Sequence, residues 1–180
     1  RIGSEGVQWP CESEDDEGTT YLHADEFPTE DGLGKIRGVR HQPPNEEEDE
    51  EYLLRLTTGR IEEHYNTGEM SRRSANLMRR TDENFIDINP ADAEAKGIED
   101  GDMVRLRTRR GEITVRAQVT EAAKEGTVWT TPHFTDSPAN RVTNDATDPV
   151  AKIPEFKAAA ATIEVDVEPV DADAEPAEGD

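Results

Sequence analysis

One polar loop in the sequence gathers side chains whose chemistry suits an anionic ligand. It holds Gly59, Arg60, His64, Asn66 and Thr67 within nine positions. Glycine lets the backbone approach a ligand closely. Arginine offers a planar two-pronged donor to phosphate, and histidine and asparagine add directional hydrogen bonds. The loop follows a strand-like run at residues 52–56, so the pattern predicts a site for a phosphate-bearing cofactor beside a folded core.

The charge around this loop differs from that of the whole chain. The chain carries a net charge of −22, yet residues 60–80 hold five arginines against three glutamates. A locally basic segment in an acidic chain favours an anion site. A second interpretation stays open, in which the four arginines of residues 71–80 form the solvated face of an amphipathic helix.

The elements that must position this loop are mostly short strands. Residues 85–89 read as a strand, and residues 91–96 as a helix that Asn89 caps and Gly97 ends. Residues 103–108 and 113–120 alternate as a hairpin around Arg110 and Gly111, and residues 127–131 and 159–165 are further strands. The order predicts a compact, mainly β barrel with short helices. The glycine-rich dinucleotide and P-loop fingerprints of doubly wound sheets are absent.

A long polar loop at residues 131–148 is the second candidate for function. It contains His133 and Asn140 and joins two predicted strands. Loops of this length inside a compact domain usually carry function.

Composition changes along the chain and predicts four parts. Residues 1–44 show no sustained periodicity and read as an extended segment packed on something else. Residues 45–51, NEEEDEE, predict an acidic linker because like charges repel and extend the chain. Residues 52–166 hold the predicted strands. Residues 167–180 contain no basic residue and predict a disordered acidic tail.

The charge and the cysteine count restrict the function classes. A net charge of −22 argues against binding nucleic acid or an anionic membrane surface. The single Cys11 excludes an internal disulfide and a cysteine-based zinc or iron–sulfur site. No apolar run is long enough to span a membrane, and no signal peptide is visible. Because the first residue is Arg1 and not methionine, we expect the chain to be a fragment or a processed piece.

The acidity also bears on the environment of the protein. Acidic residues are spread along the chain and lysines are few, as in proteins adapted to a salt-filled cytosol, where salt screens self-repulsion. We therefore expect a cytoplasmic, halophilic protein. The alternative is an ordinary acidic protein with acidic tails.

Several motifs of residues 53–165 resemble the C-terminal molybdopterin-dinucleotide-binding domain of the molybdopterin oxidoreductases. They keep the order and spacing of that family over about 110 residues. The motifs are LTTGR at 56–60 with His64 and Thr67, INPADA at 88–93, GIEDGD at 97–102, RRG at 109–111, PHF at 132–134, AN at 139–140, DP at 148–149 and PEFK at 154–157.

Within that superfamily the chain is most similar to formate dehydrogenase catalytic (alpha) subunits. Residues 6–11 (GVQWPC), 18–19 (GT) and 21–23 (YLH) resemble the stretch before the cofactor domain in those enzymes. The resemblance implies that residues 1–44 are the C-terminal end of an upstream catalytic domain. Assimilatory nitrate reductases share much of this stretch, so they remain the alternative.

The resemblance implies a double-psi β-barrel that binds a bis(molybdopterin guanine dinucleotide) cofactor with molybdenum or tungsten. In this view Arg60 and Lys157 oppose pyrophosphate charge, and Asn66 and Asn140 read guanine or pterin edges. The full set of residues implied to bind the cofactor is Gly59, Arg60, His64, Asn66, Thr67, His133, Asn140 and Lys157. For His133, a structural hydrogen-bonding role is the competing interpretation.

The chain departs from the family pattern in ways that limit its expected activity. It lacks the metal-ligating cysteine or selenocysteine, its neighbouring catalytic histidine and arginine, and the cysteine cluster of an iron–sulfur centre. In the family those groups lie upstream. The resemblance therefore implies a cofactor clamp that is inactive alone. Its implied partners are the rest of the catalytic chain and an electron-transfer subunit. The implied reaction is formate to carbon dioxide with transfer of two electrons.

Two further alternatives stay open at this point. The chain could be a stand-alone dinucleotide-binding subunit, which the resemblance of residues 1–44 to a catalytic domain argues against. It could instead be a non-enzymatic double-psi barrel that serves as an interaction module. Residues 89–102 alone fit that second alternative, but the loops around Arg60 and His133 are unexplained by it.

Overall fold

The computed structural model describes residues 6–165, so the predicted tail at 167–180 lies outside the described residues. The contacts divide the chain into two compact units between Gln42 and Pro43. In the first unit, residues 6–42 form no helix, and their only pairing is a bridge between Gln8 and Gly18. Thr19 fastens this bridge by donating from its N–H to the Gln8 carbonyl at 3.0 Å and from its hydroxyl to the Pro10 carbonyl at 2.8 Å.

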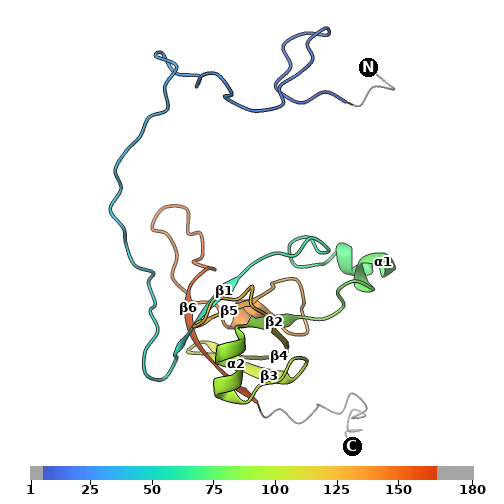
Figure 1. Cartoon of the computed structure of the whole chain (residues 1–180), viewed down its shortest axis with the longest axis vertical. Helices are drawn as coiled ribbons and strands as arrows, with labels where there is room; N and C mark the ends of the chain where they lie inside the picture. Colours follow the sequence, from blue (N-terminus) through green and yellow to red (C-terminus); the bar gives the residue numbers. More distant parts are fainter. Residues whose placement is uncertain (1–5, 166–180) are drawn as a thin grey trace, which may run out of the picture. The chain divides into compact units, whose positions relative to one another are not determined.

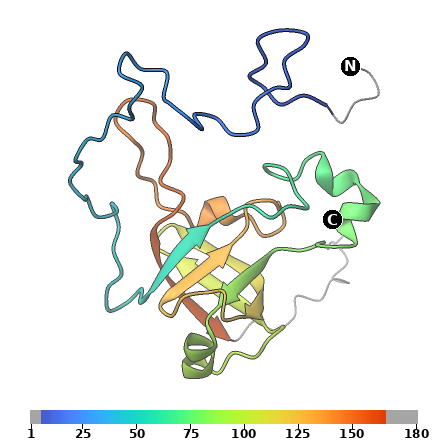
Figure 2. The ribbon, with the colours of Figure 1, turned by 45° about the horizontal axis from the view of Figure 1, so that its top comes forward.

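The second unit is a closed six-stranded barrel, which confirms the predicted mainly β fold with short helices (Figures 1 and 2). Around the barrel the strand order is β1, β5, β2, β4, β3, β6. The pairs β1–β5 and β2–β4 are parallel and the other pairs are antiparallel. The elements are β1 (Leu54–Thr58), η1 (Ser71–Arg73), α1 (Ala75–Met78), β2 (Phe85–Ile88), α2 (Pro90–Lys96), β3 (Met103–Thr108), β4 (Gly111–Val119), β5 (Thr127–Thr130), η2 (Ala139–Arg141) and β6 (Ala159–Val165).

The barrel forms because alternate residues of each strand are apolar. In β1 the burial pattern alternates between buried and half-buried residues, and β2 and β5 alternate in the same way. Successive side chains of a strand point to opposite faces, so one set fills the barrel interior. The interior set includes Leu56, Ile86, Ile88, Val104, Leu106, Val115, Val128 and Ile163, each at most 1% exposed.

Helix α2 forms as the sequence predicts, with signals at both ends. The Asn89 side chain accepts the Ala91 N–H at 2.9 Å, and Pro90 occupies the first helical position. Gly97 ends the helix at φ +66°, in the left-handed region that glycine enters without strain. Ala93 and Ile98 then bury one side of the helix against the barrel core.

The segment at residues 71–80 differs from the single amphipathic helix of the second interpretation. It breaks into η1 and α1 because Ser74 between them is extended, with ψ 112°. Neither piece buries a residue, and in Figure 1 α1 lies out to one side, away from the barrel strands. Arg73, Arg79 and Arg80 are exposed, as that interpretation expects, but Leu77 and Met78 on the other side are only half-buried.

The acidic segment at residues 45–51 packs on the barrel, within the second unit. The Glu46 carboxylate accepts hydrogen bonds from Arg110 Nη2 at 2.9 Å, from Arg109 Nη1 at 3.1 Å and from the Ala160 N–H at 2.8 Å. The ring of Tyr52 lies under the Arg109 guanidinium, 4.7 Å from its centre. Two arginines in the β3–β4 turn thus offset the repulsion among the acidic side chains of this segment. That repulsion was the reason for predicting an extended linker.

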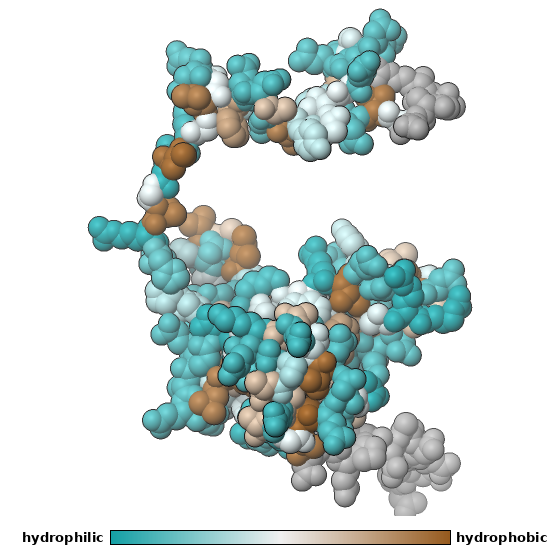
Figure 3. Space-filling model, in the orientation of Figure 1, coloured by the Kyte–Doolittle hydropathy of each residue, from teal (hydrophilic) through white to brown (hydrophobic). Residues whose placement is uncertain are grey.

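Further ion pairs of the barrel are spread over its outer surface, which is predominantly hydrophilic in Figure 3. Arg55 donates to Glu48 at 2.8 Å, and Arg116 pairs with Glu83. Among the described residues, no helix has the length and apolar content needed to cross a membrane.

Glu46 supplies a first testable prediction, because its carboxylate by itself bonds the acidic segment to both the β3–β4 turn and β6. Burial alone would raise the pKa of Glu46, but the hydrogen bonds from Arg110 and Ala160 hold that pKa below its ordinary value of 4.5. We expect Glu46→Gln to lower the free energy of unfolding by about 1.5–3 kcal/mol at neutral pH, the usual contribution of a hydrogen bond to a charged group.

The sign of the pH dependence provides the check. A lowered native pKa stabilises the fold above the unfolded-state pKa near 4.5, and this contribution is lost as the pH falls through the lower native value. Urea unfolding at a series of pH values should therefore show the difference between wild type and Glu46→Gln shrinking below about pH 4.5. Glu50→Gln, at an exposed position of the same segment, is the matched control. An equal loss in both variants would contradict a specific role for Glu46.

Candidate functional site

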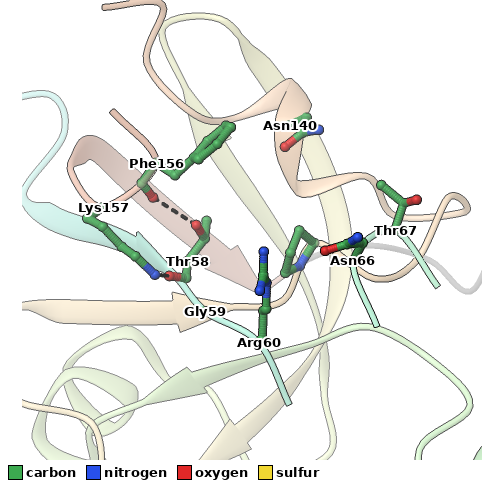
Figure 4. A pocket seen from close by; sticks show the side chains of 9 residues that line it. Thr58, Gly59, Arg60, Asn66, Thr67, Asn140, Phe156 and Lys157 are labelled. Carbon is green, nitrogen blue, oxygen red and sulfur yellow. Dashed lines mark hydrogen bonds between the residues drawn. The ribbon is translucent and has the colours of Figure 1, made fainter. Parts of the chain in front are cut away.

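A cavity of about 590 Å³ opens at the end of the barrel where the parallel strands β1 and β5 finish (Figure 4). Parallel strands bring their carboxyl ends to one edge, so the loops that follow them meet there. The β1 side contributes Gly59 and Arg60, the β5 side contributes Pro132, and the turn before β6 contributes Lys157. The lining residues are Thr58, Gly59, Arg60, Asn66, Thr67, Pro132, Asn140, Phe156 and Lys157.

The structure brings together six of the eight residues that the sequence predicts for the site. Asn66 and Thr67 come from the loop after β1, and Asn140 comes from η2 some seventy positions later. The lining contains arginine and lysine but no aspartate or glutamate, in a chain with a net charge of −22. The cavity is therefore a locally cationic concavity, which suits an anionic ligand.

Gly59 is required at the mouth of this cavity for a steric reason. A Cβ atom at Gly59 would lie 2.3 Å from Nε1 of the Trp129 indole. The Gly59 N–H donates to the Thr130 carbonyl at 3.1 Å, which continues the β1–β5 pairing by one residue. The glycine thus lets β1 pass close to the Trp129 ring before Arg60 turns into the cavity.

The Arg60 guanidinium is available for a ligand. It makes no hydrogen bond or ion pair with any of residues 6–165, unlike Arg55 and Arg116 on the barrel wall. The side-chain amides of Asn66 and Asn140 are likewise uncommitted within the described residues. Figure 4 shows these three side chains around one opening. Arginine and amide donors that converge without partners can bind phosphate and read the edge of a heterocycle.

Lys157 is held at the cavity rim by the backbone of β1. Its Nζ donates to the Thr58 carbonyl, and the Thr58 hydroxyl donates to the Phe156 carbonyl at 2.8 Å. These two bonds tie the turn before β6 to the end of β1. An ammonium group carries three donor hydrogens, so Lys157 keeps others for a ligand.

Three lining residues were missed by the sequence reasoning, namely Thr58, Pro132 and Phe156. Each lies inside one of the motifs given above and directly precedes a predicted site residue, namely Gly59, His133 or Lys157. Phe156 is 42% exposed, although aromatic side chains are usually buried. The motifs contained all three residues, but the apolar side chains of Pro132 and Phe156 carry no chemistry that marks them as ligand contacts, and the Thr58 hydroxyl bonds the Phe156 carbonyl.

The two predicted histidines lie behind the cavity wall and not on it. His133 is fully buried and His64 is 4% exposed, with ring centres 5.9 Å apart. The His64 Nε2 donates to the Thr81 carbonyl at 2.8 Å, and its Nδ1 lies 3.1 Å from the Ser71 hydroxyl. Direct cofactor contact by either histidine stays a prediction.

His133 forms hydrogen bonds through both ring nitrogens to the loop that follows β1, residues 59–68 (the cavity loop). Its Nε2 accepts the Ile61 N–H at 3.1 Å, and its Nδ1 donates to the Asn66 carbonyl. Burial lowers the pKa of His133 below its ordinary value, the Asn66 carbonyl opposes this change, and the nearby His64 and Arg60 lower the pKa further. The ring is therefore neutral near pH 7.

A second region has a buried acidic group but a different character. A cavity of about 410 Å³ on the barrel wall is lined by Asp87, Lys124 and Trp129, among others. Burial raises the pKa of Asp87, and its Oδ1 has no hydrogen-bond partner within the described residues. One carboxylate beside one lysine does not suit an anion, and the described residues contain no cluster of three or more metal-binding side chains.

A family model and several known proteins match the part of the chain that forms this cavity. The model of the molydopterin dinucleotide binding domain matches residues 54–160. The alpha subunit of F420-dependent formate dehydrogenase 1 from Methanococcus maripaludis is 45% identical over 91% of this chain and 24% of that protein. The corresponding alpha subunit from Methanocaldococcus jannaschii is 46% identical over the same shares.

Two other matches are more distant. The assimilatory nitrate reductase catalytic subunit of Bacillus subtilis is 37% identical over 88% of this chain and 23% of that protein. The structure of acetylene hydratase from Pelobacter acetylenicus superimposes with a TM-score of 0.57 at 18% identity, over 64% of this chain and 18% of that one. This superposition shows a shared fold. The chain spans about a quarter of the length of the curated relatives it matches.

Proposed function

Because this chain belongs to the molydopterin dinucleotide-binding family, we propose that it is the cofactor-clamping part of a formate dehydrogenase. The family and the barrel fold confirm the predictions made from the motifs. We further propose that the barrel is of the double-psi type, which its two parallel strand pairs support.

The observation that carries the proposal is the set of uncommitted donors around one cavity. Arg60 offers a charged fork without any partner among residues 6–165, and Lys157 holds an ammonium group at the opposite rim. Asn66 and Asn140 add amide groups that both donate and accept. This donor set fits a group with a pyrophosphate and a heterocyclic base.

We assign the six lining residues from the predicted set to the dinucleotide: Gly59, Arg60, Asn66, Thr67, Asn140 and Lys157. Arg60 and Lys157 balance the phosphate charge, and Gly59 lets the backbone approach the ligand closely. When bound, the metal-carrying pterin supplies the two-electron chemistry. The residues of this chain bind and orient the dinucleotide and close one side of its cavity.

The finer features of the enzyme are part of the same proposal. The cofactor is a bis(molybdopterin guanine dinucleotide) with molybdenum or tungsten, and an iron–sulfur cluster belongs to another part of the catalytic chain. An electron-transfer subunit is its partner. We place the enzyme in a salt-filled cytoplasm because acidic residues are spread along the whole chain, at a net charge of −22.

Formate is favoured over nitrate as the substrate. The formate dehydrogenase subunits are 45–46% identical to this chain, against 37% for the nitrate reductase. The test is dye reduction by the full product of the gene in high salt, with formate as electron donor, run beside nitrate reduction. Formate oxidation together with bound pterin is the expected result. Nitrate reduction alone would overturn the substrate, and absence of both activities and of pterin would overturn the enzyme assignment.

A further inference from the structure

His133 bonds the loop that lines the cavity, but its own side chain does not line the cavity. Its ring is fully buried, and the cavity lining does not include it. Its two ring nitrogens bond the backbone of Ile61 and of Asn66, the first and last residues of one short segment. Arg60 directly precedes this segment, and Asn66 ends it inside the lining.

We propose that His133 is a positioning residue, whose neutral imidazole holds the 61–66 segment so that Arg60 and Asn66 face one ligand. The inference rests on the proposed function of the cavity as an anion site. It gives His133 a role that differs from direct cofactor contact, because every hydrogen-bonding atom of the ring is already used inside the protein.

The geometry selects one form of the imidazole. The Ile61 N–H can only donate, so Nε2 must be without a hydrogen, and the Asn66 carbonyl can only accept, so Nδ1 must carry one. A carbonyl or hydroxyl side chain could satisfy one end of the segment, but a neutral imidazole satisfies both. Protonation would place a second hydrogen on Nε2, facing the Ile61 N–H, and would break that contact.

His133 bonds the two ends of the segment, whereas other contacts hold its middle: His64 Nε2 donates to the Thr81 carbonyl at 2.8 Å, and the Tyr65 N–H donates to the Ser71 hydroxyl at 3.1 Å. Asn66 has φ +50°, in the left-handed region that asparagine enters more readily than most residues with a side chain. Residues 61–66 belong to no helix or strand. On the other side of the loop, Arg72 donates to the Thr135 hydroxyl at 2.8 Å. The loop is therefore fastened to the segment after β5 at two points, and only the His133 point bonds within residues 61–66.

The charged and titratable groups that face His133 define the pH response. They are His64, at 5.9 Å between ring centres, and Arg60 on the cavity loop, while Arg72 lies over the neighbouring Phe134 ring. Burial, with help from His64 and Arg60, lowers the pKa of His133, so the neutral ring persists below the ordinary histidine value of 6.5. Ligand affinity should fall once the pH drops below that lowered pKa, because the imidazolium releases Ile61.

The test uses the whole 180-residue chain and guanosine 5′-diphosphate as the probe. Calorimetry measures affinity for wild type, His133→Gln and His133→Leu at several pH values. A glutamine amide offers one acceptor and one donor, so it can replace both bonds, whereas leucine replaces neither. We expect His133→Leu to bind about tenfold more weakly, since two preorganising hydrogen bonds are lost, and His133→Gln to stay within about threefold of wild type.

The ratio of the wild-type affinity to the His133→Gln affinity, measured against pH, reports the pH dependence of binding that is due to His133 alone. Both proteins keep His64 and Arg60, and the probe titrates identically in both, so its own phosphate titration cancels. The ratio should fall in acid and be constant near neutral pH. Thr130→Val is the control for loss of a buried hydrogen bond, because the Thr130 hydroxyl donates to Phe85 or Asn84 and touches nothing in the cavity loop. It should lower stability without changing affinity.

Two further measurements on the same proteins test the positioning role of His133 separately from anion binding by the cavity. Nitrogen-15 chemical shifts of the His133 ring report the tautomer, and hydrogen exchange reports protection of the Ile61 amide. The expected result is hydrogen on Nδ1 and an Ile61 amide that loses protection in His133→Leu but not in Thr130→Val. Hydrogen on Nε2, an unprotected Ile61 amide, or wild-type affinity in folded His133→Leu would overturn the positioning role.

Failure of the proposed function has its own signature. If the wild-type chain does not bind the diphosphate while the tautomer and the Ile61 protection are as expected, the anion site is wrong and the fastening of the loop stands. The claim that this fastening serves a ligand is then overturned as well. If His133→Leu does not fold, the ring tautomer of wild type and the acid ratio with His133→Gln decide the matter.

Discussion

Arg60→Ala is expected to weaken diphosphate binding by about ten- to a hundredfold while leaving the thermal unfolding temperature unchanged. A charged hydrogen bond to a ligand is worth about 1.5–3 kcal/mol, and each 1.4 kcal/mol is about tenfold in affinity. Stability should not change, because Arg60 has no protein partner among residues 6–165 that its removal would orphan. Calorimetry with guanosine 5′-diphosphate and a thermal melt measure the two quantities on one sample.

The matched control removes the same charge outside the cavity. Arg73 is exposed on η1, belongs to the same basic segment, and does not line the cavity. Arg73→Ala should change affinity by less than about threefold, an amount that reports long-range attraction and disappears in salt. Equal losses in the two variants would show that the segment acts through its overall charge, and the placement of Arg60 in the site would then be wrong.

Gly68→Ala should be the most damaging single-methyl change in the loop. Gly68 has φ +76°, and a Cβ atom there would lie 2.4 Å from the His133 carbonyl oxygen and 2.6 Å from Cδ of Arg72. The left-handed conformation costs an alanine about 1–2 kcal/mol. The clash adds further strain because a backbone carbonyl cannot rotate away as a side chain can. We expect a loss of about 3 kcal/mol in the free energy of unfolding, measured by urea denaturation.

The control for Gly68→Ala separates conformation from contact. Gly97 has φ +66°, and nothing lies within 4 Å of a Cβ atom placed there. Gly97→Ala should therefore cost only the conformational part, about 1 kcal/mol. Gly68→Ala should also weaken diphosphate binding, because the loop that carries Asn66 and Thr67 must shift. If the two alanine variants lose equal stability, the close approach to His133 is not what the loop depends on.

Local patterns in the sequence were sufficient for most strands and for helix α2, although β1 covers Leu54–Thr58 and not the predicted residues 52–56. The alternation in residues 103–108 and 113–119 placed a hairpin, and Asn89 and Gly97 placed the ends of a helix, because these signals act through neighbours in the chain. The same signals were weak at residues 71–80. Short-range helix preference there was overridden by the extended Ser74, and neither piece of the segment buries a residue.

The acidic segment shows what charge patterns leave out. Residues 45–51 read as a repelling linker because only their own charges are visible in the sequence. Arg109 and Arg110 lie some sixty positions away, and the β3–β4 turn brings them onto Glu46. A long-range ion pair has no local signature, so only the folded chain reveals it.

By itself, the sequence determined the family and the barrel class, and it predicted the chemistry of the site. The motifs around Arg60, Asn140 and Lys157 name those side chains, because a charged fork, an amide and an ammonium group carry their chemistry wherever they lie. Only the tertiary structure decided which of them face one cavity and which stand behind it. Judged by residue type alone, His133 and Arg60 are equally suited to bind a ligand. The parallel ends of β1 and β5 turn Arg60 into the cavity and bury His133 beneath it, because direction depends on how distant strands pair and not on residue type.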